Sequence, residues 1–288
     1  RRRRGGDPQA HAGPGVHLVT SLLAAATGVG DLLAAPFGSH AGWALVVWSV
    51  LFGLTAIVLF KLSTPQARLA AARDRLVGRL LEAALFQTSL RTIVRVQGAV
   101  LVANLRYLVF ALPAIAALVI PLLLVLPQLE SRVGRRPLQV GEATLVTASV
   151  AGRAAPLTLE AEGDLAIEAG PVYDPSRGEL VWRVRPAAAG VHALRLTGGG
   201  ETIALEVPVA ATGLPAIAAA RHAGWFDQLL HDPAAPTLPA QAPVTRLAIA
   251  LPPRQVSILG VSPHWLVSFT VLSLAAGLLL KKPLRVEI

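Results

Sequence analysis

The stretch WALVVWSVLFGLTAIVLF, from Trp43 to Phe60, contains no charged residue. At about 1.5 Å per residue, a helix of this length is about long enough to cross the ~30 Å hydrocarbon core of a bilayer. A second uncharged stretch, YLVFALPAIAALVIPLLLVLPQ, runs from Tyr107 to Gln128. The two stretches predict transmembrane helices at 43–61 and 107–128, and the prolines of the second predict kinks in it.

The sequence between these stretches, 62–106, is strongly basic and has only Asp74 and Glu82 as acidic residues. This excess of arginine places the segment on the cytoplasmic side of the membrane. Apolar residues recur along it at helical spacing, which predicts two helices in an antiparallel coiled-coil hairpin and argues against a plain solvated linker. The arginines expected to contact anionic lipid or the ribosome are Arg68, Arg73, Arg75, Arg79, Arg91 and Arg95.

A third apolar stretch, HWLVSFTVLSLAAGLLL at 264–280, is followed by Lys281, Lys282 and Arg285. The basic residues predict a cytoplasmic tail at 281–288, and the aromatic ring of Trp265 suits the outer interface. The sequence therefore predicts three transmembrane helices, with the N-terminus outside and the C-terminus inside.

Composition supports a membrane protein, since 53% of the residues are hydrophobic and only 15% are charged. The formal charge of +9 is not accompanied by an aromatic platform for nucleic acid bases. The absence of cysteine excludes disulfides, thiol nucleophiles and zinc–thiolate sites. The absence of methionine, even at position 1, indicates a processed, truncated or incompletely assigned chain.

The N-terminal segment 1–16 is rich in Arg, Gly and Pro, which predicts a disordered tail, with the n-region of a signal peptide as the alternative. Residues 17–38 place apolar side chains on one helical face, which predicts an amphipathic helix lying in the membrane interface. A short signal-like apolar segment is the alternative interpretation.

After Leu129 the sequence changes to short, alternating apolar runs with Gly and Pro between them. This pattern predicts an immunoglobulin-like β-sandwich at 137–210, outside the cytoplasm. Strands are expected at 143–150, 156–161, 180–186, 190–197 and 202–209. Residues 211–262 are expected to form a membrane-proximal linker with one short helix at 214–231.

No combination of residues in the sequence predicts catalysis, and neither a cofactor nor a metal is expected. His222, Asp227, His231 and Asp232 do not match a metal-ligand spacing. The polar residues at or near membrane depth are the candidates for a hydrophilic groove: Asn104, Arg106, Ser49, Thr55, Ser268, Thr270 and Ser273. Arg106 either faces such a groove or extends to the inner headgroups. The hydroxyl groups either line a pathway or bond to their own helices.

The order of elements resembles the YidC/Oxa/Alb membrane-protein insertases, in particular the three-span archaeal YidC-like proteins and subunits of the endoplasmic-reticulum membrane complex. The matching segments are LLAAPFG, the Trp43–Phe60 stretch, KLSTPQARLAAARDRLVGRLLEAALFQ, NLRYLVFALP and HWLVSFTVLSLAAGLLLKKPL. The resemblance implies a non-enzymatic insertase with a groove arginine, for which Arg106 is the nearest match. The sandwich departs from bacterial YidC, whose large outer domain precedes the core.

The first functional hypothesis is thus an insertase or chaperone in a bacterial inner membrane. Its expected partners are the lipid bilayer, nascent membrane proteins and the ribosome. The alternative is a non-catalytic scaffold or complex subunit whose sandwich, 137–210, binds an extracytoplasmic protein. A transporter is a third hypothesis, although three spans are few and no inverted repeat is visible.

Overall fold

The computed structural model describes residues 27–38, 40–64, 66–85, 90–150, 156–258 and 260–284. The chain divides into two compact units, each described by itself below. The helical unit comprises Leu45–Leu123 and Leu266–Ile288, and the sheet unit comprises Arg1–Ala44 and Leu124–Trp265. The predicted tail 1–16 and residues 17–26 of the predicted amphipathic helix lie outside the described residues.

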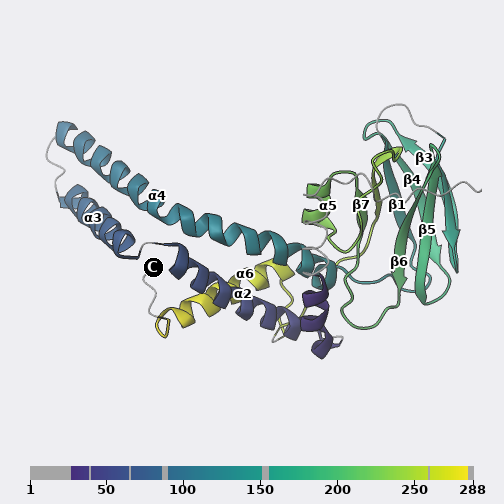
Figure 1. Cartoon of the computed structure of the whole chain (residues 1–288), viewed down its shortest axis with the longest axis horizontal. Helices are drawn as coiled ribbons and strands as arrows, with labels where there is room; N and C mark the ends of the chain where they lie inside the picture. The colour runs from purple at the N-terminus through teal and green to yellow at the C-terminus, as the bar shows by residue number, and fades with distance from the viewer. Residues whose placement is uncertain are drawn as a thin grey trace, which may run out of the picture. The chain divides into compact units, whose positions relative to one another are not determined.

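Four helices build the helical unit or enter it: α2 (Ala41–Ser63), α3 (Gln66–Leu85), α4 (Leu90–Leu129) and α6 (Trp265–Lys281) (Figure 1). Among the described residues, α2 and α4 are the two helices long and apolar enough to cross a membrane. The stretch predicted as a third span forms α6, which is apolar but shorter, with 17 residues.

Helix α4 joins two segments that the sequence analysis separates at residue 106. It runs without interruption from the basic hairpin into the apolar stretch as one helix of 40 residues, so the second hairpin helix and the second apolar stretch are parts of the same helix. No glycine or proline lies between Asn104 and Leu112 to end the helix there. The helix also continues through Pro113, although an interior proline removes one backbone donor and crowds the preceding turn.

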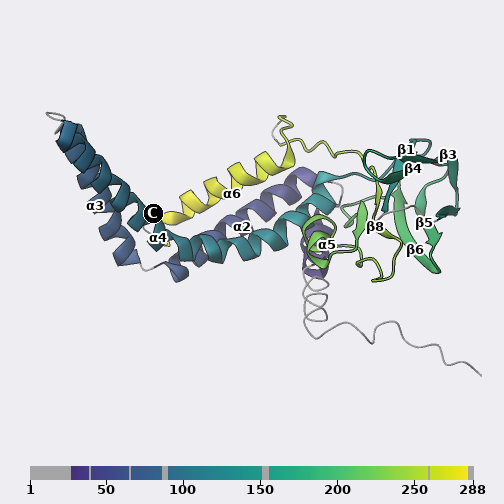
Figure 2. The same ribbon diagram turned by 90° about the horizontal axis from the view of Figure 1, so that it is seen from above.

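Helices α2 and α6 form a parallel pair within the helical unit (Figures 1 and 2). The rings of Phe52 and Phe269 lie 5.2 Å apart between centroids. Further along, the Nζ of Lys61 donates a hydrogen bond to the carbonyl of Leu284 at 2.9 Å. Residue numbers increase in the same direction along both segments from the first contact to the second, so the two helices are parallel.

The sheet unit contains two antiparallel sheets. The five-stranded sheet has the order β3-β4-β1-β8-β7, and the three-stranded sheet has the order β2-β5-β6. The strands are β1 (Thr144–Val150), β2 (Thr158–Glu162), β3 (Leu165–Asp174), β4 (Glu179–Pro186), β5 (Gly190–Gly198), β6 (Glu201–Val209), β7 (Ala220–His222) and β8 (Val244–Ile249).

The two sheets share one apolar core, built from alternate residues of their strands. In β6, Ile203, Leu205 and Val207 are buried while the residues between them are exposed. In the facing sheet, Val146 of β1 pairs with Trp182 of β4, and both side chains belong to the same core. Strands β1, β4 and β6 therefore lie where the alternating runs of the sequence predict strands, and their alternate side chains face the core.

The predicted boundary of the sandwich at residue 210 falls short of the sheets that form. Strands β7 and β8 come from the stretch predicted as linker, and Leu247 and Ile249 of β8 enter the core. Strand β3 was also not predicted, because it is an edge strand that contains Pro171 and two register shifts. The structure thus extends the folded region through most of 211–262.

Short helical segments complete the sheet unit. Residues 27–34 are helical and continue into the 3-10 turn η1 (Ala35–Phe37). Helix α4 ends in the π-helical turn η2 (Glu130–Gly134). The helix predicted at 214–231 is confined to α5 (Trp225–His231), because the residues before it form β7 and the turn that follows it.

Candidate functional site

The contact between α2 and α6 is made by small residues. A Cβ atom built on Gly53 would lie 2.9 Å from the Cβ of Ala276 and would also overlap the carbonyl oxygen of Ser273. Ser49 and Gly53 on α2, like Ser273 and Gly277 on α6, are four residues apart and so share a face. This small-xxx-small spacing lets helix backbones approach closely in a membrane.

Several hydroxyl groups that are candidates for a groove donate hydrogen bonds to carbonyls of their own helices, namely those of Ser49, Thr55, Thr270 and Ser273. Ser49 is fully buried, and its Oγ donates to the carbonyl of Leu45 at 2.6 Å. Thr55 donates to the carbonyl of Leu51 at 2.9 Å, and Thr270 donates to that of Leu266 at 2.8 Å. The Oγ of Ser273 donates to the carbonyl of Thr270 at 3.1 Å, and Ser268 is buried. The buried Ser49 and Ser268 therefore belong to the packed part of α2 and α6, whereas Thr55 and Thr270 remain exposed while their hydroxyls bond to their own helices.

Asn104 and Arg106, the remaining candidates, lie exposed on α4 just before its uncharged stretch. The guanidinium carbon of Arg106 lies 6.0 Å from the centroid of the Phe110 ring, a cation–π distance. In the described chain, no carboxylate lies within ion-pair distance of Arg106. These two polar groups thus belong to α4, whereas the candidate hydroxyls belong to α2 and α6.

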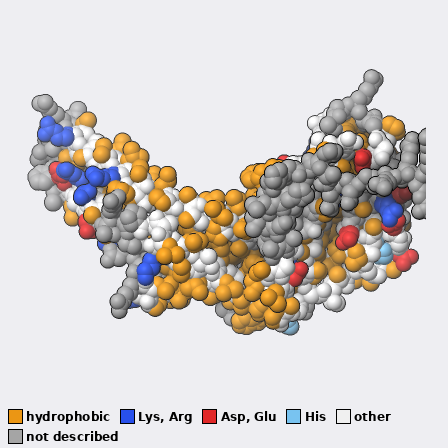
Figure 3. Space-filling model, viewed as in Figure 1, with side chains coloured by type: hydrophobic (Ala, Val, Ile, Leu, Met, Phe, Trp, Pro, Cys, Tyr) orange, Lys and Arg blue, Asp and Glu red, His pale blue; other side chains and the backbone are white. Residues whose placement is uncertain are grey.

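The hairpin arginines lie on two helices that run side by side (Figures 1 and 2). Arg73 lies 3.7 Å from Asp74, and Arg79 forms an ion pair of 2.6 Å with Glu82. Arg75 and Arg95 are exposed. The side chains of Arg68 and Arg91 lie outside the described residues. On the face drawn in Figure 3, basic side chains gather over this hairpin, and apolar side chains predominate along the part of the helical unit beyond it.

Arg132, which the sequence analysis did not single out, is the largest fully buried side chain among the described residues, with 1% of its surface exposed. It lies in η2 and donates to Asp31 Oδ1 at 2.6 Å, to the carbonyl of Thr27 at 3.0 Å and to the side chain of Gln128. A Cβ on Gly30 would lie 2.9 Å from its guanidinium carbon, so glycine leaves the space for this approach. The Arg132 cluster (Thr27, Asp31, Gln128, Arg132) fastens the 27–34 helix to the end of α4.

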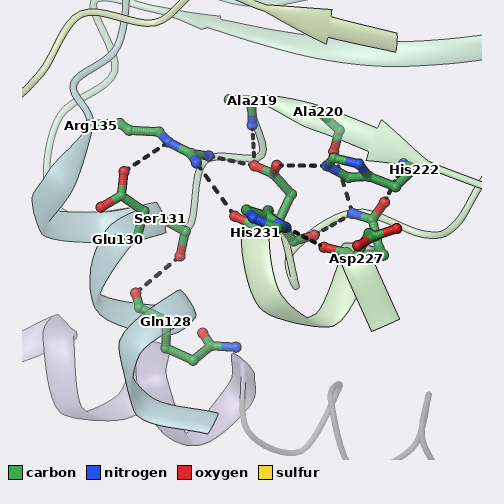
Figure 4. A network of polar contacts seen from close by, with 11 residues as sticks. Gln128, Glu130, Ser131, Arg135, Ala219, Ala220, His222, Asp227 and His231 are labelled. Atoms are coloured by element: carbon green, nitrogen blue, oxygen red, sulfur yellow. Dashed lines mark hydrogen bonds and ion pairs between the residues drawn. The ribbon is translucent and has the colours of Figure 1, made fainter. Parts of the chain in front are cut away.

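A second buried network includes Arg135, Ala219 and His222 (Figure 4). It is centred on Asp232, the residue that follows α5. Its carboxylate accepts hydrogen bonds from Arg135 and from the backbone N–H of Ala219, and Arg135 also pairs with Glu130 at 3.3 Å. Gln228 donates to the carbonyls of Ala220 and Asp232 and accepts from the N–H of His222. This Asp232 network joins the end of α4 to β7 and α5.

The residues considered as metal ligands meet in this network without forming a metal site. The rings of His222 and His231 lie 5.6 Å apart, and His222 Nε2 lies 3.5 Å from Asp232 Oδ2. Asp232 is already bound by a guanidinium group and an amide, which leaves it little capacity for a cation. Throughout the described part of the chain, no three His, Asp or Glu side chains are grouped to hold a metal ion.

Burial lowers the pKa of His222 below its ordinary value, and Arg246 and His231 lower it further, while Asp232 opposes the shift. The unfolded chain, in which a histidine has a pKa of about 6.5, therefore takes up the proton at a higher pH than the folded chain does. The stability contributed by neutral His222 is complete above about pH 6.5 and is lost as the pH falls toward the folded-state value.

We expect the melting temperature of the sheet unit to fall by a few degrees between about pH 7.5 and about pH 5.5. Thermal unfolding of the full chain in detergent, followed by tryptophan fluorescence, measures this change. His222→Gln should flatten the pH dependence, whereas His40→Gln, at an exposed site, should leave it intact. An equal pH dependence in wild type and His222→Gln would assign the effect to other groups.

Comparison with known proteins adds no assignment. No family model matches the chain, and no curated protein or solved structure matches it.

Proposed function

We propose that the chain is an insertase or chaperone of membrane proteins, related to the YidC/Oxa/Alb type. The observation that carries the proposal is the open apolar face of α4. In the 18-residue apolar segment of α2, 33% of the residues are buried inside the chain, whereas in the corresponding segment of α4 only 6% are buried. Exposed residues on α4 include Leu105, Leu108, Leu112 and Ile115. A lipid-facing helix that its neighbours leave uncovered offers a place for a client helix to pack.

The position of the polar groups favours a site at the entrance to the membrane over a polar groove along the spans. Asn104 and Arg106 lie at the boundary between the basic hairpin and the apolar part of α4. An arginine without a described carboxylate partner can attract an acidic or polar client segment before its apolar part reaches α4. Desolvating that segment beside a fixed positive charge costs less than desolvating it in lipid alone.

The proposed topology has three membrane crossings, with the hairpin and the C-terminus in the cytoplasm of a bacterium and the sheet unit outside. The parallel pairing of α2 and α6 supports it, because both helices then cross in the same direction and bring Lys61, Lys281 and Lys282 to the cytoplasmic side. At about 1.5 Å per residue, the 17 residues of α6 span about 25 Å, which a slightly thinned bilayer accommodates.

Photocrosslinking during translation tests this proposal. Probes on the open face of α4 are expected to capture ribosome-bound nascent chains of a short membrane protein in vesicles that contain the full chain. No capture from any position on that face would contradict an insertase.

The alternative function, a membrane-anchored scaffold, is supported by a hollow on the sheet unit. A pocket of about 410 Å³ lies beside β6 and is lined largely by alanine and proline, with Glu206 and Arg221 as its charged residues. If the two sheets are an immunoglobulin-like domain, this pocket is where an extracytoplasmic protein would bind. A stable stoichiometric partner in mild detergent, lost with the Ala204→Trp variant, would favour this function.

A further inference from the structure

A groove lies between α3 and α4, and its proposed ligand does not depend on whether the membrane helices accept clients. The two helices enclose an open groove of about 570 Å³ in the hairpin. Its floor is made of small residues that include Ala72, Gly78, Gly98 and Ala103. No atom lies within 4 Å of a Cβ built on Gly78 or Gly98, so the space above both glycines is open.

The rim of the groove is cationic. Arg75, Arg79 and Arg106 line it, and Glu82 is the acidic residue among the lining residues. Glu82 is already paired with Arg79 at 2.6 Å. Among the described residues, neither Arg75 nor Arg106 has a carboxylate within ion-pair distance. The groove therefore combines an apolar floor with two positive charges that lack a carboxylate partner within the described chain.

We propose that this groove binds an acidic amphipathic helix of another protein. From Ala72 to Glu82 the groove follows α3 for about 15 Å, the length of three helical turns. The small residues of the floor allow a helix to approach closely, and glutamates on its flanks reach Arg75 and Arg106. This is the helix-in-groove mode of peptide recognition with an added electrostatic term.

The shape and direction of the groove favour a helix over the other anionic ligands. A phospholipid would place its acyl chains in the membrane, whereas the apolar floor extends from Arg106 along the hairpin, away from the apolar part of α4. RNA would gain little from a floor of alanine and glycine. Arg1–Arg4 and Lys281–Arg285 of this chain are basic, as is the hairpin of a second copy, so none of these complements the rim.

The test measures binding of a fluorescein-labelled helical peptide of about 15 residues, with glutamates on both flanks of an Ala/Leu face. The full chain is held in nanodiscs of phosphatidylcholine, and fluorescence anisotropy gives the dissociation constant. Arg75→Gln combined with Arg106→Gln should weaken binding by at least about fivefold. Gly98→Leu, which fills the open floor, should weaken it by about tenfold.

Matched controls separate a groove from general charge attraction. Arg95→Gln and Gln97→Leu change exposed positions that do not line the groove. Each should change the dissociation constant of the peptide less than about twofold. A peptide with glutamine in place of glutamate should bind at least about fivefold more weakly, because it loses the same ion pairs. The proposal is overturned if Arg95→Gln weakens binding as much as the loss of Arg75 and Arg106, or if Gly98→Leu has no effect. It is also overturned if binding of RNA or of phosphatidylglycerol vesicles is weakened by the loss of Arg75 and Arg106 while binding of the peptide is not.

Discussion

Gly53→Leu is expected to separate α2 from α6 and to destabilise the helical unit by about 1–3 kcal/mol. The leucine Cβ would lie 2.9 Å from the Cβ of Ala276 and would collide with the backbone of Ser273, which cannot turn away as a flexible side chain could. The stability lost is the packing of the parallel pair, including the contact between Phe52 and Phe269. Denaturant unfolding in mixed micelles, followed by circular dichroism, measures it.

Gly78→Leu is the matched control for this substitution. Gly78 lies in the middle of α3, and no atom lies within 4 Å of a Cβ built there. Because leucine favours a helix over glycine by up to about 1 kcal/mol, this variant should be neutral or slightly more stable. Equal stability changes at the two glycines would show that α2 and α6 do not pack through Gly53.

Arg132→Ala is expected to lower the free energy of unfolding by about 2–5 kcal/mol, through lost hydrogen bonds and a new cavity, and to release the 27–34 helix from the end of α4. The substitution leaves Gln128 and the carbonyl of Thr27 without their donor, and it opens a cavity in place of the largest fully buried side chain. Arg132→Lys should recover little, since an ammonium group cannot reproduce the guanidinium fork that reaches Asp31, Thr27 and Gln128 together.

Two readouts test the Arg132 cluster. The melting temperature should fall, and residues 27–38 should become sensitive to a protease added at low concentration. Arg177→Ala, at an exposed turn between β3 and β4, should change neither. If residues 27–38 of Arg132→Ala stayed resistant to the protease, this arginine would not be what holds the 27–34 helix against the end of α4.

The sequence predicts most of the secondary structure because its strongest signals are local. Uncharged stretches predict α2 and α4, and alternation predicts β1, β4, β5 and β6. The continuity of α4 is less visible, because the change from basic to apolar residues near Arg106 suggests a boundary although nothing there breaks a helix. Strand β8 is hidden for another reason, since its six residues acquire their buried face only by pairing with β1.

The candidate site is predicted less well, because it depends on contacts between distant residues. The sequence identifies Ser49 and Ser268 as polar groups in apolar stretches, but only the fold shows that they lie buried. Arg132 is missed because its partner Asp31 lies 101 residues away. A charge directly after an apolar stretch, together with an acid in an earlier amphipathic segment, is the signal that identifies such a pair.

The most direct test of the proposed insertase function is site-specific photocrosslinking in vesicles translating a short membrane protein. Probes replace Leu108 and Leu112 on the open face of α4, and Tyr173, which is exposed on the sheet unit, serves as the control. The proposal predicts crosslinks to ribosome-bound nascent chains from both α4 positions and none from Tyr173. Silence at Leu108 and Leu112, with capture of one defined protein from Tyr173, would contradict it and identify the chain as an anchored interaction module.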